Sequence, residues 1–341
     1  GQMNLSISEL LASQAWYLHA IDGGSANYIE MNEAAFAASP FLDQRIAAPK
    51  DGRKFKARIA TITGAPAWAG ASIPSPRRYM LARIAGISPT CLALREPVPL
   101  RYLARHLEDQ GTPQAWHSPE NFKALVDFTL RNLGRPLGER SRVVVKCTSW
   151  VNPLGDHFLK SEQGDGARVA AAFVGLPNFV ANTLKGAGGV TDLRSNAQSR
   201  LRRLQKLVPE VDTPLYTMKP GQIAAMTWLC ELLTIRAVCE RAAASVQWID
   251  FDAFMQAPEE GARTLANQLD LDWDDRSDDL LIKSGVLGAY SKAGKSVKFS
   301  NDERISLLEK FKSDNAALIE EAHRWVQAVI KTHAIDVPWY K

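Results

Sequence analysis

Short runs of aliphatic and β-branched residues alternate with longer segments of helical spacing along most of this chain. The strand-like runs lie at 57–63, 90–94, 143–147, 169–174 and 246–250. Between them, apolar residues recur every three or four positions, as they do at 223–244. Strands that alternate with helices are typical of an α/β domain, in which a mostly parallel sheet carries helices on both faces. The pattern therefore predicts that the five runs form one such sheet.

The first 56 residues lack this regular alternation. Residues 28–31 are a candidate for an edge strand, and the segment NEAAFAA at 32–38 predicts a short helix that Asn32 can cap. No chemistry-bearing motif stands out here. We therefore expect an N-terminal cap at 1–56 over a large α/β domain at 57–341.

The run at 143–145 consists of three valines between polar flanks, which is typical of a strand buried on both faces. Lys146, Thr148 and Ser149 follow it directly. In an open parallel sheet, ligands bind just beyond the carboxyl ends of the strands. One cation and two hydroxyls at that position suit an anionic ligand. The alternative is an ordinary strand end with a solvated lysine.

The run at 90–94 ends on Arg95, Glu96 and Pro97, and the proline stops the strand. A guanidinium and a carboxylate therefore stand at the sheet edge. If Glu96 lies beside the end of the Lys146 strand, its carboxylate is placed to act as a general base. A lone exposed glutamate is the alternative.

The segment 64–76 is rich in Gly, Ala and Pro and predicts a loop between the strand at 57–63 and a helix at 77–85. Strand, glycine-bearing loop and helix are the order in which phosphate-cradling sites are built. The GxxxxGK[ST] motif is absent, however. Four side chains remain candidates for holding an anion: Ser72, Ser75, Arg77 and Arg78. A solvated connection is the alternative.

Basic residues recur in the second half of the chain. The helical segment 194–207 contains Arg194, Arg200, Arg202 and Arg203, which predicts a solvated basic face. Beyond the strand at 246–250, Asp252 is placed to cap a helix. A glycine-bearing loop at 290–299 carries Lys292, Lys295 and Lys298, and it is a candidate phosphate clamp or a solvated loop.

The C-terminal region predicts one long helix. Ser300 and Glu303 form a capping box, and an apolar face continues from there to Val329.

The composition limits the classes of function. The 341 residues carry a net charge of +4 without a dense Lys/Arg block, so we expect no nucleic-acid partner. Four cysteines form neither a CxxC pair nor a Cys/His cluster, so we expect no metal site. There is no apolar stretch of about 18 residues and no signal-peptide pattern at the start, so we expect a cytoplasmic protein without membrane contact.

Five segments resemble motifs of bacterial sulfotransferase-like proteins of the P-loop fold. They are LALREPVPL (92–100), VVVKCTSW (143–150), AAFVGLPNFVANTLKGAGG (171–189), VQWIDFDAFMQAP (246–258) and YSKAGKSVKFS (290–300). The resemblance implies transfer of a sulfo group from 3′-phosphoadenosine 5′-phosphosulfate to a hydroxyl or amine of a small-molecule or peptide acceptor, without a metal.

The resemblance also implies roles for individual residues. Glu96 is similar to a catalytic base, and Lys146 is similar to the lysine that contacts the transferring group, with Arg95 and Ser149 beside them. The loop at 290–298 is similar to one that closes over the 3′-phosphate of the donor.

Two departures from the family pattern favour alternatives. The segment 71–81 lacks the family's Ser/Thr–Gly–Thr chemistry, and Gly175–Asn178 with Asn182 replace an arginine and a serine that bind the 3′-phosphate. A catalytically silent relative that binds a partner or peptide is therefore the main alternative. A nucleotide-dependent kinase is a third, although the Walker lysine is absent.

Overall fold

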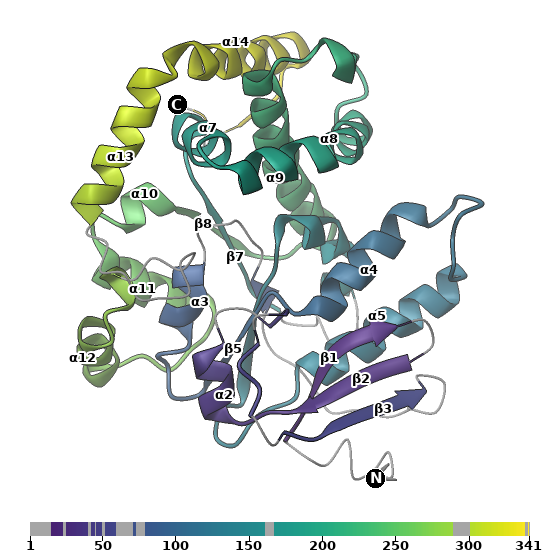
Figure 1. The fold of residues 1–341 in the computed structure, drawn as a ribbon, viewed down its shortest axis with the longest axis vertical. Coiled ribbons are helices and arrows are strands. Elements are labelled where there is room, and N and C mark those ends of the chain that lie inside the picture. Colours follow the sequence, from purple (N-terminus) through teal and green to yellow (C-terminus); the bar gives the residue numbers. More distant parts are fainter. Residues whose placement is uncertain are drawn as a thin grey trace. The chain divides into compact units, whose positions relative to one another are not determined.

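Figure 1 shows a computed structural model of the chain, which describes residues 15–22, 25–39, 42–44, 46–49, 52–58, 71–72, 79–160, 167–288, 301–337 and 340. The chain divides into two compact units. Unit 1 comprises Gly1–Ala172, Cys239–Trp248 and Ala257–Val297, and unit 2 comprises Phe173–Val238, Ile249–Gln256 and Lys298–Lys341.

An antiparallel sheet lies near the start of unit 1. It contains β1 (Trp16–Asp22), β2 (Ser25–Glu30) and β3 (Lys54–Arg58), in the order β1-β2-β3. The edge strand predicted at 28–31 is therefore wrong, because β2 pairs on both sides. Of the strand predicted at 57–63, the described residues 57–58 are the end of β3 and pair antiparallel with β2, outside the parallel sheet. The boundary predicted at residue 56 falls within β3, and the division into a cap and one large domain stays a prediction.

The parallel sheet of unit 1 has the central strand that the sequence predicts. β4 (Ala71–Ser72), β6 (Arg142–Lys146) and β5 (Cys91–Arg95) are parallel, in that order. Val143, Val144 and Val145 of β6 are buried. The helix α3 (Tyr79–Ala85) packs on β5 and β6. The predicted α/β class is confirmed.

The parallel sheet is less extensive than the sequence predicts. β7 (Val169–Phe173) and β8 (Val246–Asp250) pair with each other as a separate two-stranded sheet. Only two residues of β4 are described, and within the described residues no ladder joins β7 or β8 to β4-β6-β5. The five predicted strands thus fall into three sheets in the described part of the chain.

The other helices of unit 1 surround these strands. They are α2 (Glu33–Ala38), α4 (Val98–Asp109), α5 (Pro119–Leu133), the 3-10 helix η2 (Ser149–Leu154), α6 (Gly155–Lys160), α11 (Pro258–Gln268), α12 (Asp275–Lys283) and the 3-10 helix η5 (Val286–Gly288). Asn32 caps α2 as predicted, because its Oδ1 accepts from the Ala35 N–H at 2.8 Å. Ser118 caps α5 in the same way, accepting from the Asn121 N–H at 3.2 Å.

Unit 2 is mostly helical. It contains α7 (Leu176–Leu184), α8 (Ala187–Leu207), the 3-10 helix η4 (Leu215–Thr217), α9 (Pro220–Arg241, of which the last residues belong to unit 1), α10 (Phe251–Phe254), α13 (Asn301–Asp314) and α14 (Ala316–His333). The single long C-terminal helix is thus two helices, which separate at Asn315. Ser300, half of the predicted capping box, lies outside the described residues. Asp250 rather than Asp252 caps α10, because its carboxylate accepts from the Asp252 N–H at 3.0 Å.

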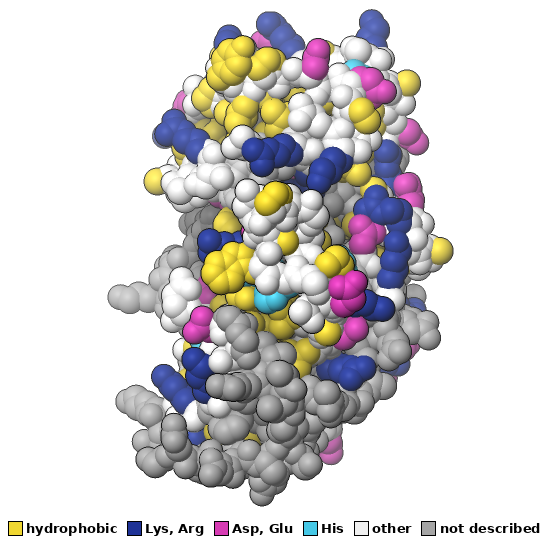
Figure 2. Space-filling model, turned by 90° about the vertical axis from the view of Figure 1, so that its right-hand side faces the viewer, with side chains coloured by type: hydrophobic (Ala, Val, Ile, Leu, Met, Phe, Trp, Pro, Cys, Tyr) yellow, Lys and Arg dark blue, Asp and Glu magenta, His cyan; other side chains and the backbone are white. Residues whose placement is uncertain are grey.

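The helix α9 is long and apolar enough to cross a membrane by length and composition alone, and most of its apolar stretch is buried within the protein. On the face shown in Figure 2, basic and acidic side chains are interspersed rather than gathered into one basic block. The expectation of no nucleic-acid or membrane partner stays a prediction.

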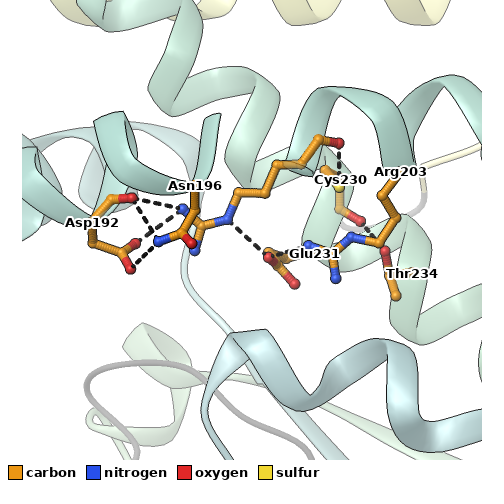
Figure 3. A network of polar contacts seen from close by, with 7 residues as sticks. Asp192, Asn196, Arg203, Cys230, Glu231 and Thr234 are labelled. Atoms are coloured by element: carbon orange, nitrogen blue, oxygen red, sulfur yellow. Dashed lines mark hydrogen bonds and ion pairs between the residues drawn. The ribbon is translucent and has the colours of Figure 1, made fainter. Parts of the chain in front are cut away.

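The predicted basic face of 194–207 is only partly solvated. Arg194 and Arg202 are exposed, whereas the Arg200 side chain is only 3% exposed. Arg200 and Arg203 both donate to Glu231 Oε1 of α9, at 3.1 and 2.7 Å, and Arg200 also pairs with Asp192 at 3.0 Å (Figure 3). We call Asp192, Arg200, Arg203 and Glu231 the helix charge cluster. Helical spacing alone did not reveal that α9 supplies a buried carboxylate to α8.

Candidate active site at the ends of β5 and β6

The ends of β5 and β6 lie at the same level of the parallel sheet. Arg95, the last residue of β5, is in register with Lys146, the last residue of β6. On the other side of β6, Ser72 of β4 is also in register with Lys146. The sequence prediction that the ends of these strands share one sheet edge is therefore confirmed.

Glu96 leaves β5 in an unusual conformation. Its φ is +54°, which places a non-glycine residue in the left-handed region, directly before Pro97. A residue before proline favours extended backbone, so this conformation is strained, at a cost of about 1–3 kcal/mol. The Glu96 N–H nevertheless donates to the Lys146 carbonyl at 2.7 Å, which fixes the turn against β6.

Four charged side chains meet at this strand end. Lys146 Nζ pairs with Glu96 Oε1, and an Arg101 guanidinium nitrogen donates to Glu96 Oε2 at 3.0 Å. The same nitrogen lies 3.6 Å from the carboxylate of Asp43. We call Asp43, Glu96, Arg101 and Lys146 the strand-end charge cluster. The prediction that Glu96 and Lys146 lie at the same sheet edge is confirmed, and their roles in catalysis stay a prediction.

The strand-end charge cluster is largely removed from solvent. The exposed fractions are 1% for the side chain of Asp43, 3% for Lys146, 11% for Glu96 and 35% for Arg101. Two anions and two cations give no net charge, as buried ion pairs require. Glu96 is the carboxylate on which both cations converge.

Arg95 binds elsewhere, although it was predicted to act with Glu96. Its buried guanidinium donates to the Phe36 and Ala37 carbonyls of α2, the latter at 3.3 Å. Its own carbonyl accepts from the Leu42 N–H at 2.8 Å. These contacts fix α2 and the segment that carries Asp43 to the end of β5.

Thr148 adds an uncharged donor near the cluster. Its backbone is extended, with φ −84° and ψ 165°, so its side chain shares a face with that of Lys146 two residues earlier. The Thr148 Oγ1 is buried, and no described residue hydrogen-bonds to it. Ser149, the other predicted hydroxyl, is the first residue of η2.

Cys147, between them, is buried in the core. Burial raises the pKa of its thiol to about 12, although the Lys146 charge acts in the opposite direction.

The residues predicted to hold the donor are mostly outside the described part of the chain. Ser72 is the second residue of β4, and the structure describes its backbone only. Six others lie outside the described residues: Ser75, Arg77, Arg78, Lys292, Lys295 and Lys298.

In unit 2, Gly175, Asn178 and Asn182 are the positions that the resemblance relates to 3′-phosphate contacts. Gly175 is the N-cap of α7 and offers no side chain. The Asn178 amide donates to the Asp252 carboxylate, and the Asn182 amide donates to the Asn178 carbonyl.

Sequence reasoning missed Arg101 and Asp43. Arg101 stands five residues after Glu96, where α4 brings its side chain back to the strand end, and the prolines that begin α4 are the local signal that could have revealed it. Asp43 carries no such signal, because its position depends on the contacts between α2 and Arg95.

Comparisons with known proteins find a similarity in fold to solved structures, and no match in sequence. No protein-family model matches the chain, and no curated protein sequence matches it. Among solved structures, the sulfotransferase domain of the curacin biosynthetic pathway is 13% identical and has a TM-score of 0.40, covering 81% of this chain and 100% of that domain. The sulfotransferase domain of the Synechococcus PCC 7002 olefin synthase is 16% identical with a TM-score of 0.39, covering 81% and 98%.

A third solved structure is sulfotransferase STF9 from Mycobacterium avium, which is 12% identical with a TM-score of 0.38, covering 73% of this chain and 76% of that protein. No group of three or more His, Cys, Asp or Glu side chains suited to a metal ion occurs within the described residues. These three are sulfotransferases or sulfotransferase domains, and they are similar to this chain in fold alone.

Proposed function

We propose that the strand-end charge cluster is the active site of a sulfotransferase. It moves a sulfo group from 3′-phosphoadenosine 5′-phosphosulfate to a hydroxyl or amine of a small-molecule or peptide acceptor. One observation carries this proposal. Glu96 and Lys146, which the REP and VVVK motifs relate to a base and to a sulfo-contacting lysine, form an ion pair at the ends of adjacent parallel strands.

The reaction is a direct in-line displacement. The acceptor oxygen or nitrogen attacks sulfur, and its proton passes to the Glu96 carboxylate as the new bond to sulfur forms. The bond between sulfur and the phosphate oxygen of the donor breaks, and that oxygen keeps the electron pair. The products are the sulfated acceptor, 3′-phosphoadenosine 5′-phosphate and a proton. Lys146 stabilises the charge on the sulfo oxygens, as preorganised cations do in transfer reactions.

The sulfo end of the donor fits the residues of unit 1. Lys146 supplies a cation, and the buried Thr148 hydroxyl has no described partner and can donate to a sulfo oxygen. The 3′-phosphate end does not fit, because Gly175 replaces a cation and Asp252 supplies an anion. We therefore expect weak donor binding that depends on salt concentration, because surface contacts to phosphate are screened.

The test is a transfer assay with a ³⁵S-labelled donor and a panel of alcohol, phenol, amine and peptide acceptors at low ionic strength. Wild-type protein should label at least one acceptor, and Glu96→Gln should not. Glu139→Gln is the matched control, because Glu139 is exposed and precedes β6 at its opposite end. Equal labelling by wild type and Glu96→Gln would rule out Glu96 as the base.

The second candidate function is a catalytically silent protein that binds a partner or peptide. The observation that favours it is the replacement near Gly175, where the Asn178–Asp252 contact opposes a phosphate. Wild-type protein that labels no acceptor in the same assay would favour this candidate. For either function we propose the cytoplasm as the compartment, because all four cysteines are free and buried, which is typical of a reducing environment.

A further inference from the structure

We propose that Arg101, anchored by Asp43, is a positioning residue that keeps the Glu96 carboxylate in place while an anion occupies Lys146. The inference rests on the proposed function, and it assigns a role to two residues that the sequence motifs do not include. Arg101 acts through Glu96 and does not itself contact the reacting atoms.

The first step of the argument is that Glu96 is held at both carboxylate oxygens. Oε1 pairs with Lys146 and Oε2 accepts from Arg101 at 3.0 Å. A sulfo group that binds Lys146 competes with Oε1 for the ammonium protons. With Lys146 as the sole partner, the carboxylate would either keep the ammonium from an arriving anion or lose the cation that holds it in place, because two anions then share one cation.

The second step is that Arg101 is fixed independently of Glu96. Its guanidinium lies 3.6 Å from Asp43, whose side chain is only 1% exposed. The segment that carries Asp43 is held by the Leu42 N–H bond to the Arg95 carbonyl, at the end of the strand that leads to Glu96. The contacts of Arg101 to two carboxylates use one planar group, which a lysine ammonium reproduces only in part.

The third step is that the Glu96 backbone is already set. Its φ of +54° and the 2.7 Å bond from its N–H to the Lys146 carbonyl leave mainly side-chain rotation to be controlled. Arg101 controls that rotation. A misplacement of about 1 Å can cost roughly a hundredfold in rate, so this control has a kinetic consequence.

The first experiment needs no transfer activity. Inorganic sulfate is titrated into the full chain and followed by tryptophan fluorescence, with chloride at matched ionic strength as the reference salt. The four proteins are wild type, Arg101→Met, Glu96→Gln and the double variant. We expect Arg101→Met to weaken sulfate binding several-fold in the wild-type background. The Glu96 carboxylate, no longer bound by Arg101, then competes more strongly with sulfate for Lys146. In the Glu96→Gln background the same change should have no effect.

A purely electrostatic role of Arg101 predicts an equal loss of sulfate affinity in both backgrounds, and that result overturns the proposal. Absence of sulfate binding by the wild type also overturns it, because Lys146 is then closed to an anion. Arg105→Met is the matched control, because Arg105 is an exposed arginine on the same helix. It should leave sulfate binding within about twofold, as expected for a screened surface charge.

The second experiment separates this inference from the proposed function. In the transfer assay, Arg101→Met should lower kcat by roughly 10–100-fold because positioning is lost, and should raise the donor KM by no more than the several-fold loss of sulfate affinity. Arg101→Lys should recover only part of the loss, because its ammonium reproduces the two carboxylate contacts in part. If the wild-type protein transfers no sulfo group while the four proteins bind sulfate as expected in the first experiment, the proposed function alone is contradicted. Transfer that is unaffected by Arg101→Met contradicts the positioning role alone.

Discussion

The helix charge cluster and the strand-end charge cluster each contain two acidic and two basic side chains, but their surroundings differ. The helix charge cluster joins residues in the regular turns of α8 and α9, where Glu231 accepts from two arginines. A thiol contact supports it, because Cys230 Sγ donates to the Arg200 carbonyl at 3.2 Å (Figure 3). The strand-end charge cluster instead depends on a residue with φ +54° and lies beside a buried hydroxyl without a described partner.

On the proposed function, the difference separates a cluster that holds structure from one that is prepared for a ligand. Strained backbone persists where surrounding contacts enforce it, and such positions concentrate at functional sites. Buried ion pairs alone are weak evidence for either role, since they often add little net stability. The predictions below therefore test whether substitutions in the strand-end charge cluster mainly lower activity and substitutions in the helix charge cluster mainly lower stability.

The largest effect should come from Glu96→Gln, measured as the rate of sulfo transfer. Loss of the base should lower kcat by about 10²–10⁴-fold. Glutamine keeps an oxygen that can accept from Lys146, so the free energy of unfolding should fall by at most about 3 kcal/mol. An unchanged kcat in Glu96→Gln would mean that the strand-end charge cluster is no more involved in sulfo transfer than the helix charge cluster.

The next effect should come from Glu231→Ala, which removes both accepting oxygens, measured by denaturant unfolding. Arg200 and Arg203 both lose the carboxylate that neutralises them, and Arg200 is buried. Removing one partner of a buried ion pair typically costs about 3–5 kcal/mol, which is the loss we expect here. The rate of transfer per folded molecule should stay unchanged, and a large loss of rate would show that the helix charge cluster also serves catalysis.

The smallest expected effect is a loss of folding stability at high pH, to which each of the two regions contributes one buried cysteine. Burial raises the pKa of Cys147 to about 12 and also raises the pKa of Cys230, so both thiols stay protonated in the folded protein. An unfolded chain releases these protons above pH ~8.5, the ordinary pKa of cysteine. The stability contribution is therefore fully present below that pH and is lost as the pH rises toward 12.

Unfolding free energies at pH 7, 9 and 10 test this expectation. The decline above pH 9 should be shallower in Cys147→Ala and in Cys230→Ala than in the wild type. Rapid reaction of either thiol with a disulfide reagent in the native protein at neutral pH would contradict the assigned burial.

Much of the strand-end site could be predicted from the sequence, because it depends on local signals. The three valines of β6 and the Arg-Glu-Pro ending of β5 placed Glu96 and Lys146 at one sheet edge. Asn32 marked the start of α2 for the same reason, since capping chemistry is local.

What failed depends on contacts between distant segments. The pairing of β2 with β3 spans the chain from 25 to 58, and no periodic pattern reveals that β2 lies in the middle of its sheet. Arg200 was assigned to a solvated face because its carboxylate partner lies on another helix. The break at Asn315 interrupts an apolar face that continues on both sides, so periodicity alone predicted one helix.

The most direct test of the central claim is a calorimetric titration with 3′-phosphoadenosine 5′-phosphosulfate, on the wild type and on Lys146→Met. A charge-assisted hydrogen bond contributes about 1.5–3 kcal/mol, so on the proposed function the two 3′-phosphate contacts that the resemblance implies to be missing should lower affinity by roughly a hundredfold or more. The account predicts weak binding to the wild type at low ionic strength, loss of that binding at physiological salt, and no binding to Lys146→Met. Binding that is tight at physiological salt, or equal in the two proteins, would contradict it.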